Sequence, residues 1–149
     1  MSQYLLDILP LAARGYCCSQ ILALLSLSAM GCSNPGLVRA LGGLCHGMGQ
    51  CGMTCGVLTG GACVLSHSLG KGADHETPSD KADLAVSEFV DWFLARTAQY
   101  GGTACADILG ECAQGKPDMS RCAELIGEAW GQILTILTGL GADPSEPVE

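Results

Sequence analysis

The sequence has few aromatic and few basic residues. The first scarcity limits the composition of the core, and the second limits the kinds of binding partner. Phe, Trp and Tyr make up 5% of the 149 residues, so the core must consist mainly of Leu, Ile, Val, Ala, Met and Cys. There are 7 Lys and Arg against 15 Asp and Glu, for a net charge of −8. Because nucleic-acid binding requires basic patches, we expect no nucleic-acid partner.

Charged side chains are almost absent from the first half of the chain. Asp7, Arg14 and Arg39 are the only Asp, Glu, Lys or Arg residues before Lys71. A membrane-spanning helix needs about 20 mainly apolar residues, but Gly, Ser, Asn, Pro, Gln and His interrupt both long uncharged runs. We therefore predict buried helices of a soluble bundle and no membrane insertion.

The N-terminus lacks the features of an export signal. It has no basic segment before its apolar run, and Asp7 lies inside that run. The chain contains 10 cysteines, which in a small secreted protein would indicate disulfides. In a reducing compartment the same cysteines indicate metal binding or thiol redox chemistry. We expect a cytoplasmic protein of this second kind.

No convincing two-residue alternation occurs, whereas helix signals follow one another along the chain. We predict an all-α fold, a compact bundle of six or seven helices with a buried cysteine-lined site. The predicted helices cover residues 3–14, 19–30, 35–44, 50–69, 80–100, 103–109 and 119–140. A turn is expected at 115–118.

These helices are expected to form a single domain over residues 1–142, followed by a disordered tail at 143–149. Segments 19–30 and 53–69 carry no Asp, Glu, Lys or Arg, so we expect them to be the buried central helices. Glycine-faced helices and an uncharged half also predict an apolar surface that one chain does not cover. A homodimer is the expected result.

The segment 41–61, LGGLCHGMGQCGMTCGVLTGG, combines three cysteines with eight glycines. On the predicted helix, Gly52, Gly56 and Gly60 would share one face and allow another backbone to approach closely. Cys51 and Cys55 are four residues apart, so their Cβ atoms would lie about 5–6 Å apart on one helix face. That geometry suits two ligands of one metal or cluster better than a disulfide. The helix N-terminus would favour their thiolates.

The sequence contains no C-x-x-C motif. This argues against a thioredoxin-type dithiol, a zinc ribbon or a covalently bound c-type haem. No catalytic residue can be assigned. His46 is the best non-cysteine ligand candidate because it adjoins the cysteine-rich segment, and Cys63 is expected to be part of the core.

Four cysteines with their local sequences carry a family resemblance. The segments are GYCCSQ at 15–20, CGVLTG at 55–60, GTACADILG at 102–110 and SRCAELI at 120–126. This pattern resembles the redox-active protein family named for its C…CGAxxG…C…C motif, over residues 11–137. The resemblance implies a small, mainly helical redox protein, often encoded near transporter genes. In the related domain of split-Soret cytochromes an iron–sulfur site has been inferred.

The resemblance implies Cys18, Cys55, Cys105 and Cys122 as the family's four cysteines. The chain departs from the pattern at Val57, which stands where the motif has Ala. It also has six further cysteines, namely Cys17, Cys32, Cys45, Cys51, Cys63 and Cys112.

Three functional hypotheses follow. The first is an electron-transfer protein that binds an iron–sulfur cluster through the four family cysteines, with Cys51 and Cys45 as additional ligands and a redox protein as partner. The second is a store or carrier of Cu(I), which soft thiolates select and which would use most of the cysteines. The third is a thiol–disulfide enzyme in which Cys51 or Cys55 attacks as a thiolate.

Overall fold

The computed structural model describes residues 3–110 and 119–148, and within these ranges every regular element is helical. The predicted all-α fold is therefore confirmed. The elements are α1 (Leu5–Ala13), α2 (Cys18–Met30), α3 (Pro35–Leu41), η1 (Gly42–Leu44), α4 (Cys45–Met48), α5 (Gly56–Leu69), α6 (Asp80–Thr97), η2 (Ala98–Tyr100), α7 (Cys105–Leu109) and α8 (Met119–Gly139). An isolated antiparallel bridge joins Thr54 to Ala104.

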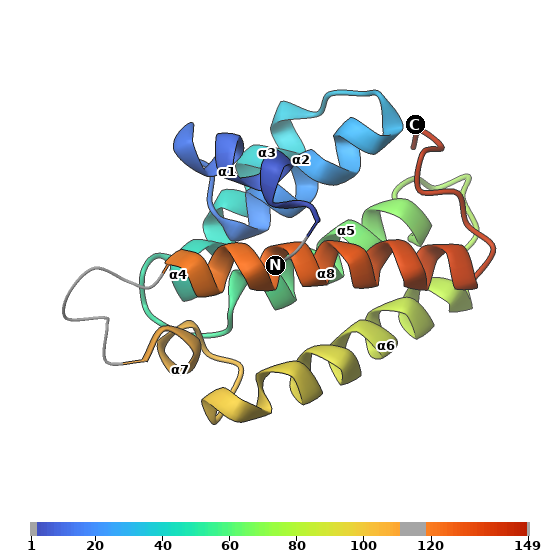
Figure 1. Cartoon of the computed structure of the whole chain (residues 1–149). Helices are drawn as coiled ribbons and strands as arrows, with labels where there is room; N and C mark the ends of the chain where they lie inside the picture. The colour runs from blue at the N-terminus through green and yellow to red at the C-terminus, as the bar shows by residue number, and fades with distance from the viewer. Residues whose placement is uncertain (1–2, 111–118, 149) are drawn as a thin grey trace.

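Helices α2 and α5 form the centre of the bundle. They pack against each other, α6 lies along α5, and the long α8 crosses α1, α2, α5 and α6 (Figure 1). Ile21, Leu22 and Ala23 of α2 and Val64 and Leu65 of α5 are almost fully buried. The two helices predicted to be central from their lack of charge are central in the structure.

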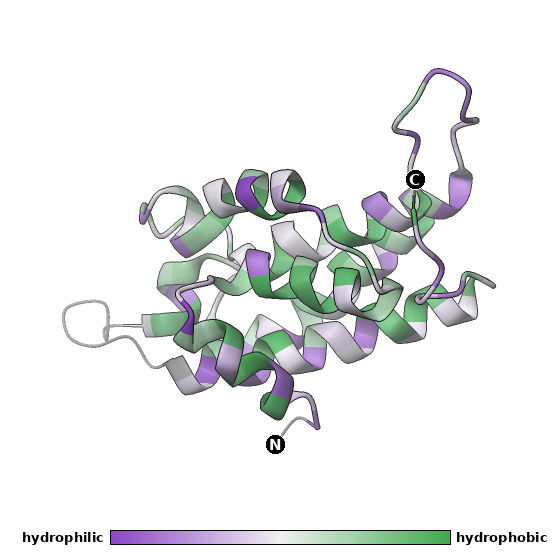
Figure 2. Ribbon diagram, turned by 90° about the horizontal axis from the view of Figure 1, so that it is seen from above, coloured by the Kyte–Doolittle hydropathy of each residue, from purple (hydrophilic) through white to green (hydrophobic). Residues whose placement is uncertain are grey.

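Local sequence signals account for most helix ends. The Asn34 side chain accepts a hydrogen bond from the Leu37 N–H at 3.0 Å, and Pro35 occupies the first position of α3. Ser79 accepts from the Lys81 N–H and caps α6. Gly31 ends α2 in the left-handed conformation. Most hydrophilic residues lie in loops and on the outer faces of the helices (Figure 2).

The helix predicted from residue 50 differs most from the structure. Helix α5 begins at Gly56, and the preceding segment is not a right-handed helix. Backbone φ is positive at His46, Gly47, Met48, Gly49 and Gln50 in succession. The glycine spacing from 52 to 60 suggested one helix, but Gly52 is itself at φ +69° outside α5.

Other predicted boundaries shift by a few residues. The helix predicted at 35–44 divides into α3 and η1, and the helix predicted to reach 100 ends at Thr97 before η2. The helix predicted at 103–109 begins at Cys105, with Ala104 as its N-cap. The turn expected at 115–118 and Cys112 lie outside the described residues.

Residues 143–148 follow α8 without helix, and the Asp143 carboxylate accepts hydrogen bonds from the N–H and Oγ of Ser145. Disorder of this tail in solution stays a prediction, as does the division into one domain and a tail. In the described part of the chain, no helix combines the length and the apolar character needed to cross a membrane.

Candidate redox site

The four cysteines singled out by the family resemblance all lie where a helix begins. Cys18 is the first residue of α2, Cys55 is the N-cap of α5, and Cys105 is the first residue of α7. Cys122 lies in the first turn of α8. Figure 1 shows α4, α7 and the start of α8 together at one end of the bundle. Free backbone N–H groups and the positive end of the helix dipole favour negative charge at such positions.

A short backbone pairing holds Cys55 and Cys105 side by side. The Cys55 N–H donates to the Thr103 carbonyl at 2.9 Å, and the Cys105 N–H donates to the Met53 carbonyl at 2.6 Å. The bridge between Thr54 and Ala104 lies between these two bonds. Residues about 50 apart in the sequence are thereby fixed next to each other, which local sequence patterns do not indicate.

Two glycines of α5 allow the start of α2 to approach closely. A Cβ atom on Gly56 would lie 2.6 Å from the Cys18 Sγ, and one on Gly60 would lie 2.7 Å from the Ser19 Cα. Both distances are too short for a side chain. The predicted glycine face thus exists at Gly56 and Gly60, and it places the Cys18 thiol against the first turn of α5.

The thiols of this region influence one another's ionisation. The pKa of Cys18 is raised to about 11, mainly by burial and in addition by the nearby Cys122 and Cys105, while the backbone amide of Ser19 opposes this. The pKa of Cys55 is raised to about 12, mainly by burial and in addition by Cys18 and Cys105, while the backbone amides of Val57 and Leu58 oppose this. Burial also raises the pKa of Cys105.

These shifts determine the resting state of the site. At neutral pH the Cys18 and Cys55 thiols hold their protons, mainly because burial removes the water that would solvate a thiolate, and also because a neighbouring thiolate would repel a second negative charge. A bound cation would remove that repulsion and displace the protons.

Four thiols are a donor set that suits a soft metal or an iron–sulfur cluster. In the part of the chain that the structure describes, however, no three or more His, Cys, Asp or Glu side chains are arranged as a ready metal-binding group. The chemistry of the donors therefore fits such a group, while a closed ligand shell is not preformed.

Cys45, predicted as an additional ligand, is instead bonded to Cys17 in a disulfide with a Cα–Cα distance of 5.8 Å. Its sulfur is therefore not available as a ligand in this structure. The buried Ser19 lies beside the bridge, with its Oγ 3.3 Å from the Cys17 Sγ and 3.7 Å from the Cys45 Sγ. The same hydroxyl donates to the Leu41 carbonyl at 2.8 Å. No sequence signal pointed to this pairing.

The proposed helical pair of Cys51 and Cys55 is wrong. Cys51 is exposed in a turn before α5, and its Sγ lies 3.8 Å from the Gly49 carbonyl oxygen. The two residues share no helix face, because the chain between them runs out of the left-handed turn and pairs with residues 103–106. The spacing of four residues therefore does not place the Cys51 and Cys55 side chains on one face of a helix.

The left-handed turn at residues 46–50 is not among the predicted elements. His46, Met48 and Gln50 are non-glycine residues at φ +55°, +64° and +66°. Left-handed backbone costs roughly 1–2 kcal/mol for each such residue. Alternation with Gly47 and Gly49 was the only sequence signal of it. His46 and Gln50 line a small cavity of about 220 Å³ that Cys105 also lines.

The remaining cysteines lie apart from this set. Cys63 is half-buried, packs against the hydrophobic core and has its pKa raised by burial. This agrees with its predicted role in the core. Cys32 is exposed in the turn between α2 and α3.

Comparison with known families matches residues 16–136, most of the chain, to the family described as "Putative redox-active protein (C_GCAxxG_C_C)". In that pattern the second cysteine lies between Gly and Ala, so the motif's Ala corresponds to Gly56 and not, as expected above, to Val57. Thr54 stands where the pattern has Gly, so membership rests on the whole match. No curated protein and no solved structure matches the chain. The chain belongs to this redox-active family.

Proposed function

We propose that the protein transfers electrons through an iron–sulfur cluster held by Cys18, Cys55, Cys105 and Cys122. The observation that carries the proposal is the position of the four cysteines at the starts of four helices, where neighbouring thiols act on Cys18 and Cys55. Cys18 is coupled to Cys105 and Cys122, and Cys55 is coupled to Cys18 and Cys105. These neighbouring thiols disfavour the thiolate forms of Cys18 and Cys55, and a cationic iron centre would reverse that effect.

The chain's own groups have definite roles in this proposal. The four thiolates would ligate iron, and the bound cluster would supply one-electron chemistry. Backbone amides of Ser19, Val57 and Leu58 face the Cys18 and Cys55 sulfurs and stabilise negative charge there. The buried position of Cys55 excludes water from one side of the site. Amide dipoles and limited solvent access are the main means by which a protein sets a cluster's potential.

The setting that we propose is the cytoplasm, with another redox protein as partner. Exposed thiols such as those of Cys32 and Cys51 persist where glutathione and thioredoxin keep cysteines reduced, and in such a setting the Cys17–Cys45 bridge would be a transient, redox-active one. The net charge of −8 would favour a partner with a basic docking face.

The test is metal and sulfide analysis of protein prepared without oxygen. We expect brown protein that contains iron and acid-labile sulfide and bleaches on reduction. Cys18→Ser, Cys55→Ser, Cys105→Ser and Cys122→Ser should each lose or grossly alter the cluster, because a hydroxyl poorly replaces a thiolate on iron. Cys63→Ala and Cys51→Ser are the matched controls and should retain it. Full iron in Cys55→Ser with loss in Cys63→Ala would show that the site is assigned wrongly.

A thiol–disulfide function is the second candidate, and the Cys17–Cys45 bridge favours it. Reduction would take two electrons and two protons from a dithiol substrate, leaving two thiols here and a disulfide on the substrate. The high pKa of Cys55 makes it a poor attacking thiolate, so this chemistry would use the bridge instead. Colourless, metal-free protein with a titratable disulfide would support this candidate. Colourless protein that binds stoichiometric Cu(I) would support copper storage.

A further inference from the structure

A large cavity of the described structure lies apart from the four family cysteines. It is a cleft of about 1060 Å³ between α1, α2, α3 and α8. None of Cys18, Cys55, Cys105 and Cys122 lines it. The redox chemistry proposed above therefore does not account for this cleft.

The charges of the first half of the chain converge on the cleft. Asp7, Arg14 and Arg39 are the only Asp, Glu, Lys or Arg residues before Lys71, and all three line it. None of the three forms an ion pair with another described residue. Arg14 directly follows α1, and Arg39 lies in the last turn of α3. A cation at the C-terminal end of a helix interacts favourably with the helix dipole. The dipoles explain a cation at each helix end, but not why both cations line one cleft.

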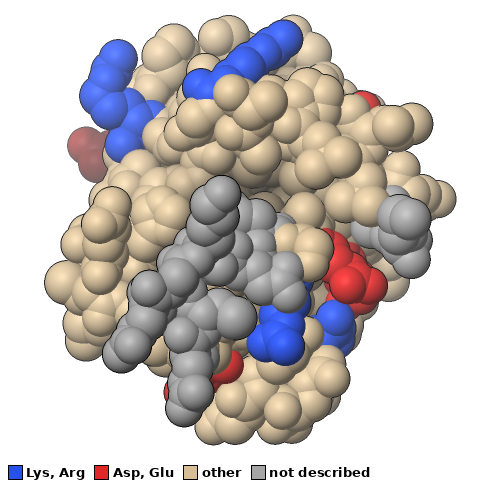
Figure 3. Space-filling view, turned by 60° about the vertical axis from the view of Figure 1, so that its left-hand side comes forward, with Lys and Arg blue, Asp and Glu red and all other residues tan. Residues whose placement is uncertain are grey.

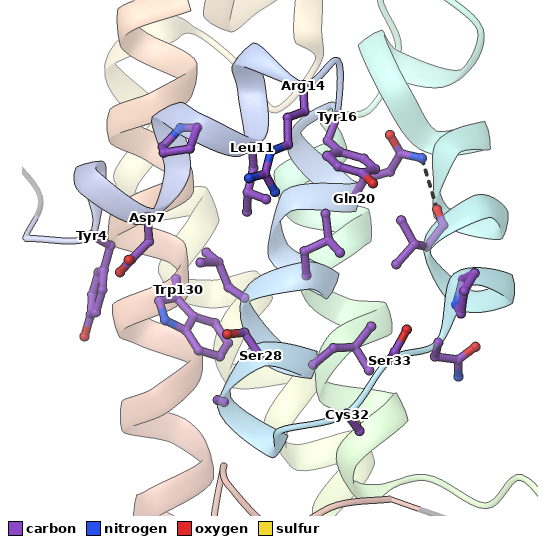
Figure 4. A pocket seen from close by; sticks show the side chains of 18 of the residues that line it. Tyr4, Asp7, Leu11, Arg14, Tyr16, Gln20, Ser28, Cys32, Ser33 and Trp130 are labelled. Carbon is purple, nitrogen blue, oxygen red and sulfur yellow. Dashed lines mark hydrogen bonds between the residues drawn. The ribbon is translucent and has the colours of Figure 1, made fainter.

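Aromatic side chains form much of the remaining wall. Tyr4, Tyr16 and Trp130 line the cleft, although the whole chain has only 7 aromatic residues. Trp130 of α8 is 5% exposed, so it is fixed in the core packing and only its edge reaches the cleft. Figure 4 shows Asp7 near Trp130 on one side of the cleft, and Arg14 near Tyr16 on the other. Flat aromatic walls favour stacking of a flat ligand.

We propose that this cleft binds an organic monoanion with a flat, apolar body. Arg14 and Arg39 attract the anionic group, because guanidinium donors match carboxylate, sulfonate and phosphate oxygens. The apolar body lies over Leu11 and reaches the edge of Trp130. Asp7 repels a second negative group at the Trp130 side, which selects a monoanion over a dianion and orients the ligand.

Trp130 provides an internal reporter for the test. In a Trp92→Phe background it is the only tryptophan, since Trp92 of α6 is the other of the two. The probes are 8-anilinonaphthalene-1-sulfonate, an aromatic monoanion, and N-phenyl-1-naphthylamine, which has the same rings without the sulfonate. We expect the sulfonate to quench Trp130 by energy transfer and to bind at least fivefold more tightly than the neutral amine.

Variants distinguish recognition of the anionic group from non-specific hydrophobic binding. Arg14→Gln combined with Arg39→Gln should weaken sulfonate binding at least fivefold and change amine binding less than twofold. Lys81→Gln, which removes a cation that does not line the cleft, should change neither. Asp7→Asn should tighten sulfonate binding, and this variant keeps the test decisive if the double variant fails to fold. Equal affinity for both probes, or sulfonate affinity that Asp7→Asn leaves unchanged, would overturn the proposal.

Discussion

At the scale of single residues, the behaviour of the site depends on buried thiols whose pKa values are raised. Cys18 and Cys55 have pKa values of about 11 and about 12, against 9.0 for an unperturbed cysteine. In the unfolded chain both thiols would ionise at ordinary values. The folded state therefore binds more protons than the unfolded state between about pH 9 and pH 12.

This difference predicts how stability depends on pH. The stabilising contribution is fully present below about pH 9 and is lost as the pH rises toward 12, because stability falls wherever the folded state binds more protons. Each pH unit of pKa difference corresponds to about 1.4 kcal/mol, so a loss of a few kcal/mol is expected. The measurement is urea unfolding of reduced, metal-free protein at several pH values.

Cys55→Ala is the matched variant for that measurement, because it removes the more strongly shifted thiol. Its stability should fall less steeply above pH 9 than that of the unsubstituted protein. A decline of equal steepness in both proteins would mean that Cys55 does not titrate as its burial and neighbours require.

A second residue-scale prediction concerns the left-handed turn. Met48 is at φ +64° and 40% exposed, whereas Met53 is 56% exposed and has no positive φ. Met48→Gly should be neutral or raise the free energy of unfolding by roughly 1 kcal/mol, because glycine adopts positive φ without strain. Met53→Gly should lower stability by a similar amount, because glycine loses more backbone entropy on folding. Chemical unfolding measures both, and equal losses in the two variants would contradict the assigned backbone.

At the scale of elements, the contact between α2 and α5 holds the Cys18 thiol against α5. Gly60 is in the interior of α5 next to the Ser19 backbone, whereas Gly139 at the end of α8 has no atom near its added Cβ position. Gly60→Ala should destabilise the protein by about 1–3 kcal/mol, since the two helices must separate. Gly139→Ala should be neutral or stabilising by up to about 1 kcal/mol.

Thermal melts of the two variants compare the same chemical change in two surroundings. We also expect Gly60→Ala to lower the cluster content of anaerobic protein, because a displaced α2 moves Cys18. A melting temperature that falls equally in both variants would indicate a helix-propensity effect instead of a packing effect.

At the scale of the whole molecule, apolar side chains remain exposed on the outer helices. Leu6 and Leu9 of α1 are 85% and 53% exposed, and Leu84 and Leu94 of α6 are about half exposed. Much of the face shown in Figure 3 is uncharged. Exposed apolar surface of this kind favours association of two copies. Light scattering should therefore give about twice the 15.3 kDa chain mass, and Leu9→Gln should shift the equilibrium toward monomer. A 15.3 kDa species at high protein concentration would contradict the dimer.

The sequence by itself determined the helical class, most helix boundaries and the burial of α2 and α5. These properties depend on neighbouring residues: caps such as Asn34, stops such as Gly31, and the absence of charge over a dozen residues. The close contact at Gly56 and Gly60 was also predictable, because two glycines one helical turn apart leave one face without side chains.

Only the tertiary structure decided which sulfurs lie together. The bridge between Cys17 and Cys45, the pairing of residues 52–55 with 103–106 and the exposure of Cys51 depend on how separate segments meet. The spacing of Cys51 and Cys55 predicted a shared helix face only on the assumption of right-handed helix from residue 50. The structure has a left-handed turn at residues 46–50 instead, and α5 begins only at Gly56. Cys51 therefore lies outside the helix that Cys55 caps, and the two side chains share no helix face.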